Sequence, residues 1–162
     1  MDYQIRPAVN ADGQRIVDIF NYYVENTMAA YPEQKVPPAF FDMLAQLAKG
    51  YPFYVAAATG SVAGYALLRP QSPMPAFRRT AELTCFISPE YTGKGIGTAL
   101  LDRLIRDARA QGIETILASV SSANEGSINF HLKHDFVRCG TFARAGRKFG
   151  KDFDEIWLQR FI

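Results

Sequence analysis

Cysteine is scarce in this sequence, and the two that occur are far apart. Among the 162 residues only Cys85 and Cys139 are cysteines, and both stand in apolar, strand-like surroundings. Two are too few for a disulfide framework, so we expect buried free thiols, which suit a reducing cytoplasm. Residues 1–7 also lack the basic and apolar regions of a signal peptide, which favours the same cytoplasmic location.

Long apolar runs and a charge of one sign are absent as well. The most apolar stretch, residues 51–68, is divided by Gly60 and Ser61 into two strands, so it predicts a hairpin and no membrane span. The formal net charge is +2, with lysine and arginine scattered along the chain, so we expect no nucleic-acid partner. No cluster of cysteine, histidine and aspartate has metal-ligand spacing, and we predict no metal.

The remaining composition is that of a globular protein. Hydrophobic residues make up 48% of the chain and charged residues 21%, both ordinary values for such a fold. A length of 162 residues is enough to bury a sizeable core. Because the sequence has no repeat, low-complexity tract or linker, residues 1–162 are expected to form a single domain.

The most informative segment is a turn with glycines at three alternate positions, Gly93, Gly95 and Gly97. It lies between a strand-like run, Thr80–Ile87, and a helix-like run, residues 99–111. Without side chains the backbone can approach a ligand closely, and the amide groups at the start of a helix favour an anion. The turn therefore predicts a phosphate-binding site.

Its spacing does not fit two common nucleotide-binding motifs. A P-loop needs Gly-Lys followed by Ser or Thr, and that sequence does not occur here. A dinucleotide fingerprint would place Thr98 or Leu100 where its third glycine must stand. Glu114 lies where the ribose-binding acid of that fold would be, but one carboxylate does not repair the glycine pattern.

The residues around the turn resemble the acetyl-CoA signature of the GCN5-related N-acetyltransferase (GNAT) family. The matching segment is residues 86–97, followed by Leu100 and Leu101. In that family the pattern is Arg/Gln-x-x-Gly-x-Gly/Ala at the start of a long helix, and its amides hold the coenzyme's pyrophosphate. Thr92 stands where the family usually has Arg or Gln, which removes a side-chain contact but leaves the amides in place.

The hydrophobic periodicity predicts the order β-α-α-β-β-β-α-β-α-β-β, which is also the order of the family. The expected strands are residues 3–6, 53–58, 62–68, 80–87, 115–120, 136–142 and 153–161. The expected helices begin after Asn10 or Asp12, at Phe40, at Ala99 and at Glu125. The resemblance therefore implies an α/β fold (α+β), the GNAT fold, with a mixed, mostly antiparallel sheet of about seven strands and helices on both faces.

Shorter matches point to the phosphinothricin and methionine sulfoximine acetyltransferase branch of the family. The most specific is the tail 145–150, followed by Asp154, Trp157 and Gln159. This resemblance implies an acetyl-CoA-dependent N-acetyltransferase that acts on the amine of a small amino-acid-like acceptor, and it implies a homodimer. The alternatives are acetylation of a peptide N-terminus or a polyamine, or a non-catalytic acyl-CoA sensor.

Glu82 is the first candidate for a catalytic role. At a model amine pKa of ~10.4 about one amine in a few thousand is neutral at pH 7, and a general base recovers part of that cost. Glu82 lies on the strand that leads to the glycine turn and matches the catalytic Glu of the branch. The alternative is a solvated carboxylate on an edge strand.

His131 occupies a position where many of these enzymes have a Tyr near the coenzyme sulfur. It could protonate the leaving thiolate, because a histidine pKa lies near neutral pH, but we favour a packing role beside the coenzyme. His134, three residues later, is expected at the surface.

The resemblance also assigns the binding residues. The coenzyme contacts are Cys85, Phe86 and Ile87 through their main chain, Gly93, Lys94, Gly95, Ile96, Gly97, Thr98, and Asn124, which could equally be a helix cap. The acceptor contacts are Phe77, Arg78, Glu82, Leu83 and Thr84. Arg78 or Arg79 would meet an anionic group on the acceptor. Ser72 stands where the branch has its substrate Arg, which weakens the case for phosphinothricin itself.

Overall fold

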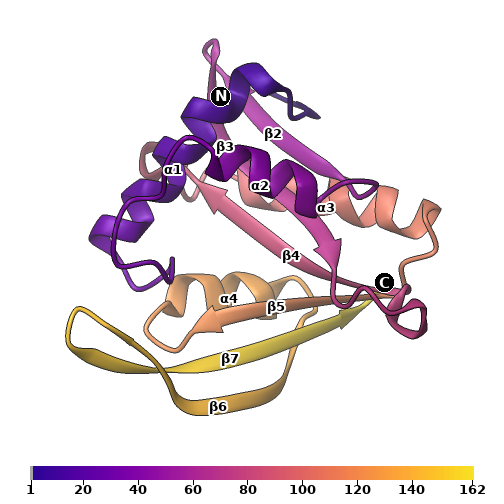
Figure 1. Cartoon of the computed structure of the whole chain (residues 1–162). Coiled ribbons are helices and arrows are strands. Elements are labelled where there is room, and N and C mark those ends of the chain that lie inside the picture. The colour runs from indigo at the N-terminus through magenta and orange to yellow at the C-terminus, as the bar shows by residue number, and fades with distance from the viewer. Residues whose placement is uncertain (1) are drawn as a thin grey trace.

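The computed structural model describes residues 2–162 as one seven-stranded sheet covered by helices on both faces (Figure 1). The strand order is β1-β2-β3-β4-β5-β7-β6, and every neighbouring pair is antiparallel except β4–β5. The strands are β1 Tyr3–Pro7, β2 Phe53–Ala58, β3 Ser61–Pro70, β4 Thr80–Ile87, β5 Thr115–Ser121, β6 Val137–Lys148 and β7 Lys151–Phe161. The helices are α1 Gly13–Asn26, α2 Phe40–Leu47, α3 Ile96–Ala110 and α4 Glu125–Lys133. The expected mixed, mostly antiparallel sheet is confirmed.

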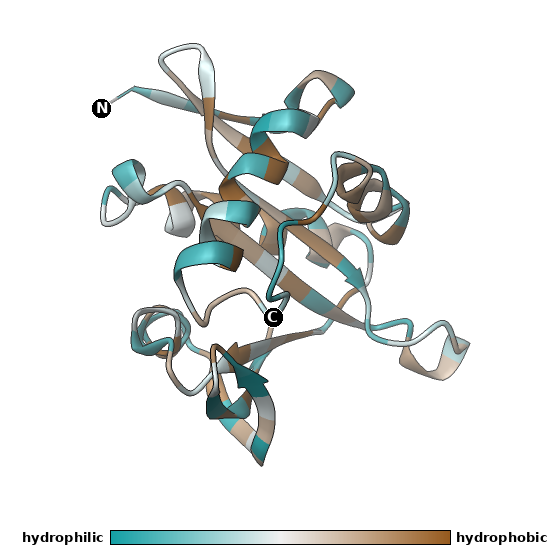
Figure 2. Ribbon diagram, turned by 60° about the vertical axis from the view of Figure 1, so that its left-hand side comes forward, coloured by the Kyte–Doolittle hydropathy of each residue, from teal (hydrophilic) through white to brown (hydrophobic). Residues whose placement is uncertain are grey.

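The core consists of two layers, one on each face of the sheet. The face covered by α3 and α4 buries the apolar stripe of α3, which includes Leu100, Leu101 and Leu104. The opposite face is covered by α1 and α2, which pack Ile16 and Phe41 against β2 and β3. The polar sides of the helices face outward while the strands between them are apolar (Figure 2).

Strand β4 is paired with β5 along only part of its length. Its parallel ladder with β5 has three residue pairs and ends at Glu82 opposite Leu117. Beyond that point the two strands diverge, although β4 stays paired with β3 as far as Ile87 (Figure 1). The β4 edge that faces β5 is therefore unpaired by any strand from Leu83 onward, and α4 lies across the opening.

The tail differs from the expectation. Strand β6 does not end at Phe142 but continues to Lys148, and a two-residue turn at Phe149 and Gly150 joins it to β7. Both turn residues have positive φ, 51° and 72°, which is the geometry of a tight hairpin. Cys139 lies exposed on the outer strand β6, so the expectation of a buried thiol is wrong for Cys139, whereas Cys85 is partly buried.

No helix in the described part of the chain is long and apolar enough to cross a membrane.

Candidate active site

The glycine turn has the backbone geometry that an anion site needs. Gly93 and Gly95 have φ of 72° and 81°, and no atom lies within 4 Å of the place where a Cβ would stand at either position. The first hydrogen bond of α3 runs from the amide of Ala99 to the carbonyl of Gly95, at 3.1 Å. The amides of residues 96–98 therefore have no acceptor within the helix and face the turn with the positive end of the helix dipole.

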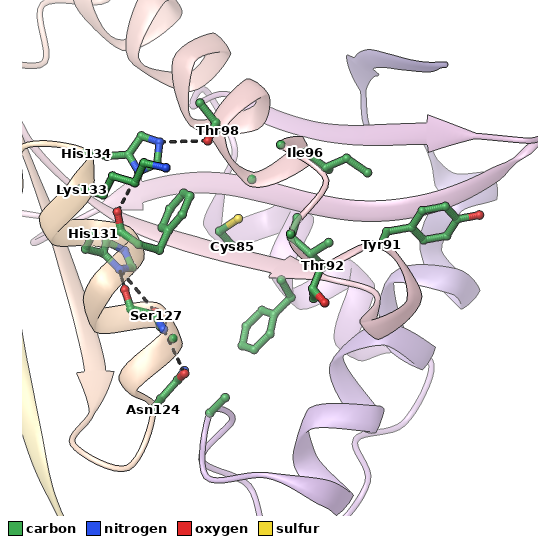
Figure 3. Close-up of a pocket in the computed structure, with 18 of the residues that line it drawn as sticks. Cys85, Tyr91, Thr92, Ile96, Thr98, Asn124, Ser127, His131, Lys133 and His134 are labelled. Atoms are coloured by element: carbon green, nitrogen blue, oxygen red, sulfur yellow. Dashed lines mark hydrogen bonds between the residues drawn. The ribbon is translucent and has the colours of Figure 1, made fainter. Parts of the chain in front are cut away.

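A groove of about 630 Å³ runs from this turn along the open edge of β4 (Figure 3). A volume of ~300–1,000 Å³ is typical of small-molecule and cofactor sites. Of the predicted coenzyme contacts, those that line the groove are Cys85, Phe86, Ile87, Gly93, Gly95, Ile96, Gly97, Thr98 and Asn124. The structure therefore brings nearly the whole predicted set to one surface.

Lys94 is the exception among these residues. Its ammonium donates to the carbonyl of Glu90 at 2.7 Å and lies over the ring of Tyr91, outside the lining of the groove. Thr92, at the family's Arg or Gln position, does line the groove, but its hydroxyl donates to the carbonyl of Pro89 at 2.9 Å. Neither side chain therefore adds a charge to the turn, where the free groups are backbone amides, and the lysine that lines the groove is Lys133 of α4.

Helix α4 forms the far wall. Asn124 caps it, because its side-chain oxygen accepts from the amide of Ser127 at 3.2 Å. Asn124 also lines the groove, so the two roles that the sequence left open are compatible.

His131 is buried between the groove and the core, with 6% of its surface exposed. Its Nδ1–H donates to the carbonyl of Ser127 at 2.7 Å, which leaves Nε2 as the acceptor nitrogen of the neutral ring. Burial lowers the pKa of His131, so the neutral ring prevails at pH 7.

His134 was expected at the surface, and that expectation is wrong. It lines the groove and connects α4 to α3, since its Nδ1–H donates to the carbonyl of Phe130 at 2.7 Å and its Nε2 accepts from the Thr98 hydroxyl at 2.9 Å. The contact between His134 and Thr98 is visible in Figure 3. No sequence pattern indicates this contact, because Thr98 and His134 are neighbours only in the folded chain.

A second cavity, of about 290 Å³, opens beside the groove. The residues that line both are Ala29, Cys85, Phe86, Asn124, Ser127 and His131. The two spaces are therefore adjacent, with a shared wall. Glu82, Leu83 and Thr84, three of the predicted acceptor contacts, line the second cavity. Its opposite wall is apolar and comes from α1 and α2, including Phe20, Phe40 and Leu44.

Arg69 is a charged residue of this cavity that the sequence analysis missed. It lies directly opposite Glu82 in the β3–β4 ladder, and its Nη2 donates to Glu82 Oε2 at 2.7 Å. The side chain of Arg69 is 40% exposed and that of Glu82 17%, so both charges reach the cavity. The buried Nε of Arg69 has no hydrogen-bond partner in the described residues.

Phe77 and Arg78 do not line either cavity. Both are exposed, and the guanidinium of Arg78 donates to the carbonyl of Pro75 at 3.2 Å. Arg79 pairs instead with Glu114 at the surface. Arg69, rather than Arg78, is the guanidinium that the structure brings to Glu82. Within residues 2–162 no group of three or more His, Cys, Asp or Glu side chains could hold a metal ion.

The comparisons with known proteins agree with this geometry. The model of the acetyltransferase (GNAT) family matches residues 16–136. An L-methionine sulfoximine/L-methionine sulfone acetyltransferase from Pseudomonas aeruginosa is 38% identical, over 98% of this chain and 94% of that protein. A GNAT superfamily phosphinothricin acetyltransferase from Sinorhizobium meliloti, solved in complex with acetyl-CoA, superposes with a TM-score of 0.93 at 33% identity and covers 100% of this chain and 89% of its own.

The chain belongs to the GNAT family. It is an acetyl-CoA-dependent N-acetyltransferase, as the resemblance implied. A further solved GNAT relative, a ribosomal-protein-alanine N-acetyltransferase from Brucella melitensis, has a TM-score of 0.91 at 34% identity and covers 98% of this chain and 99% of that one.

The residues present fit the acetyl-CoA of GNAT enzymes. The free amides at the start of α3 suit a pyrophosphate, and Gly93 and Gly95, which leave open space at the turn, both line the groove. The unpaired edge of β4 offers main-chain groups to an extended amide-bearing arm, as a neighbouring strand would. The groove is continuous between these two features.

Proposed function

We propose that this protein acetylates the amine of a small amino-acid-like acceptor by direct transfer, with Glu82 as the general base. The observation that carries the proposal is the shared wall between the groove and the cavity that holds Glu82. An amine in the cavity can approach a thioester in the groove at the level of Cys85 and His131. The names of the P. aeruginosa and S. meliloti relatives support an acceptor of the amino-acid class.

In this proposal the coenzyme lies along the groove, with its pyrophosphate on the amides of residues 96–98. The main chain of Cys85–Ile87 pairs with its pantetheine arm, and Asn124 contacts it from the start of α4. Bound acetyl-CoA would supply the thioester carbonyl that the amine attacks.

Glu82 accepts the proton that the ammonium form of the acceptor must lose. A carboxylate at hydrogen-bond distance, directly or through one water, typically contributes a factor of ~10²–10⁴ in rate. Arg69 holds the Glu82 carboxylate in place through the 2.7 Å bond. Cys85 takes no covalent part, because burial raises the pKa of its thiol to about 12 and keeps it protonated, which supports direct transfer.

In this proposal His131 has a neutral ring that lines both the groove and the cavity, and it does not act as the acid. Its lowered pKa and its donated Nδ1–H leave Nε2 without a proton to give. A coenzyme thiolate is also a tolerable leaving group without an acid. The role that the sequence favoured for His131, packing beside the coenzyme, is therefore retained.

Arg69 is proposed to receive the anionic group of the acceptor in place of Arg78. A guanidinium suits carboxylates, and Arg69 is the one that lines the cavity beside the base. The amine and carboxylate of an α-amino acid are separated by one carbon, and Glu82 and Arg69 present the complementary charges in direct contact.

A protein N-terminus is the main competing acceptor, because the B. melitensis relative is titled a ribosomal-protein-alanine N-acetyltransferase. The cavity of about 290 Å³ supports a small acceptor instead. A polyamine has no carboxylate for Arg69. An acyl-CoA sensor without catalysis leaves the position of Glu82 beside the groove unexplained.

We also propose that the protein forms a homodimer in the cytoplasm. The outer edge of the sheet, β6, has no strand beyond it among the described residues and exposes Val137 and Phe142. Unprotected apolar edge strands favour pairing with another chain. Light scattering should give a dimer for the wild type and a smaller mass for Phe142→Asp, whereas a monomeric wild type would refute the dimer.

The function is tested by thiol release from acetyl-CoA with a panel of acceptors. The panel contains L-methionine sulfone, methionine sulfoximine, phosphinothricin, spermidine and an Ala-initiated peptide. We expect turnover of the amino-acid acceptors, with phosphinothricin poor because of Ser72. Turnover of the peptide or of spermidine alone would overturn the proposed acceptor class.

A further inference from the structure

Lys148 is a fully buried charge in a place that the catalytic proposal does not use. It stands at the end of β6, beside the hairpin turn, and 0% of its surface is exposed. Its ammonium donates to three backbone carbonyls, those of Val24 at 2.7 Å, Thr27 at 2.8 Å and Ala30 at 2.6 Å. No carboxylate of residues 2–162 forms an ion pair with it.

The three carbonyls match the ammonium group in number. A lysine ammonium has three N–H donors and no acceptor, so each donor finds one carbonyl. This is necessary because a buried charge without partners is very costly. The carbonyl of Val24 belongs to the last turn of α1, where helix carbonyls lack intrahelical partners. Lys148 therefore caps the C-terminal end of α1 and also binds the chain that follows the helix.

The chain that follows is residues 27–33, which we call the wall segment. Residues 29–32 line the cavity that holds Glu82, and Ala29 also lines the coenzyme groove. The wall segment has no helix or strand of its own. Its position depends on contacts from elsewhere.

Those contacts come mainly from the β5–β7 side of the sheet. Besides Lys148, the ring of Tyr31 stacks on Phe153 at 5.6 Å and its hydroxyl hydrogen-bonds Ser119 at 2.8 Å. The amide of Phe149 donates to Glu33 at 3.3 Å. The β6–β7 hairpin thus extends back along the molecule to meet the end of α1 (Figure 1). Among these contacts the Lys148 ammonium alone binds the backbone of the wall segment at two points, Thr27 and Ala30, and it also binds α1 at Val24.

We propose that Lys148 is a positioning residue for the acceptor, which fixes the wall segment over the junction of the two cavities. The proposal rests on the proposed function for the identity of the acceptor cavity. It explains why a lysine stands at the tip of an otherwise exposed hairpin, 124 residues from Val24 in the sequence. It also assigns a role to the tail motif 145–150, which the catalytic residues leave unused.

The test compares Lys148→Met with Arg147→Met. The first keeps the length of the side chain and removes the donors and the charge. The second removes a neighbouring positive charge that pairs with Asp152 at the surface and does not touch the wall segment. Lys148→Gln, which keeps two donors, is the second variant in case Lys148→Met does not fold.

Hydrogen exchange of the wall segment is the first readout, because it needs no acceptor. We expect its amides, including those of Thr27 and Ala29, to exchange about tenfold faster or more in Lys148→Met, with α3 unchanged. Lys148→Gln should show a smaller change in the same direction. Unchanged exchange in the wall segment, or an equal increase throughout the protein, would overturn the proposal.

Kinetics with L-methionine sulfone are the second readout. Lys148→Met should raise the acceptor KM about tenfold, with kcat and the acetyl-CoA Kd within about threefold, and Arg147→Met should match the wild type. Equal losses in kcat, KM and acetyl-CoA affinity would mean a merely structural lysine. A wild type that does not turn over any amino acid of the panel would refute the proposed function, and the exchange result would still decide the role of Lys148.

Discussion

Arg69 and Glu82 are in contact in the proposed acceptor cavity. A mutation can remove the charge of Arg69 while that of Glu82 is kept. Arg69→Met should lower kcat/KM for L-methionine sulfone about 10- to 100-fold, because a charge-assisted hydrogen bond is worth ~1.5–3 kcal/mol. The measurement is thiol release at low acceptor concentration.

The matched control for this change is Arg78→Met, which removes an exposed guanidinium outside the cavity. It should leave kcat/KM within about twofold of the wild type, since isolated surface charges contribute little. For the amine analogue that lacks the carboxylate, Arg69→Met should lower kcat/KM less than it does for methionine sulfone. If Arg78→Met is the damaging variant, the assignment of the anionic group to Arg69 is wrong.

His131 should matter for binding more than for chemistry. His131→Phe should weaken acetyl-CoA binding modestly, about two- to fivefold, and leave the saturated kcat within about threefold at pH 7. Calorimetry and steady-state rates measure the two effects separately. A large fall in kcat with unchanged affinity would instead make His131 the acid.

The sequence predicted single site residues where they belong to a local motif, and it missed those that only the fold brings to the site. The resemblance implied Glu82 and Thr84 as acceptor contacts, and both line the cavity that also holds Arg69. Arg69 was missed because its partner is set by the register of β3 against β4, and the intervening loop gives no sign of that register. Arg78 was selected instead because it matches a basic position just ahead of the catalytic Glu in the branch, but in the structure it is exposed and lines neither cavity.

The glycine turn and the start of α3 together form the proposed anion site, and Gly95→Asp tests this proposal. Gly95 caps α3 with φ of 81°, so the new carboxylate would stand before the free amides and repel a phosphate. We expect acetyl-CoA affinity to fall about 100-fold or more, because the new carboxylate would repel the pyrophosphate and occupy part of its space. Calorimetric titration with acetyl-CoA measures it.

Gly60→Asp is the matched control for this substitution. Gly60 has φ of 79° and equally open surroundings, but it lies in the β2–β3 turn, outside both cavities. Both variants carry the left-handed backbone cost of ~1–2 kcal/mol, so their melting temperatures should fall alike. Equal acetyl-CoA affinities in the two variants would contradict the assignment of the turn.

The elements themselves were mostly predictable, and the β6–β7 hairpin shows where prediction failed. Asn-Gly or Asp-Gly would have signalled its tight turn, but Phe149-Gly150 does not. Glycine is required at position 146 of β6, because a Cβ there would collide with the ring of Phe153. Lys148 could not be assigned from sequence, since its three partners are brought to it by the fold.

The arrangement of the complete chain explains why the site lies where it does. The order of elements follows from hydrophobic periodicity, but the place where β4 and β5 separate does not. That separation, after three residue pairs, opens the coenzyme groove and puts its edge next to the cavity of Glu82. The tail hairpin then reaches back to the wall segment, where Lys148 donates to the carbonyls of Thr27 and Ala30.

The proton transfer to Glu82 is tested most directly by the pH dependence of Glu82→Gln. This variant keeps the shape of the side chain and removes the base, so kcat with L-methionine sulfone should fall about 100-fold at pH 7. The loss should shrink as the pH rises toward the pKa of the amine, because a growing fraction of the acceptor is then neutral without help. A Glu82→Gln enzyme with the kcat and pH profile of the wild type would contradict the account and leave Glu82 a structural partner of Arg69.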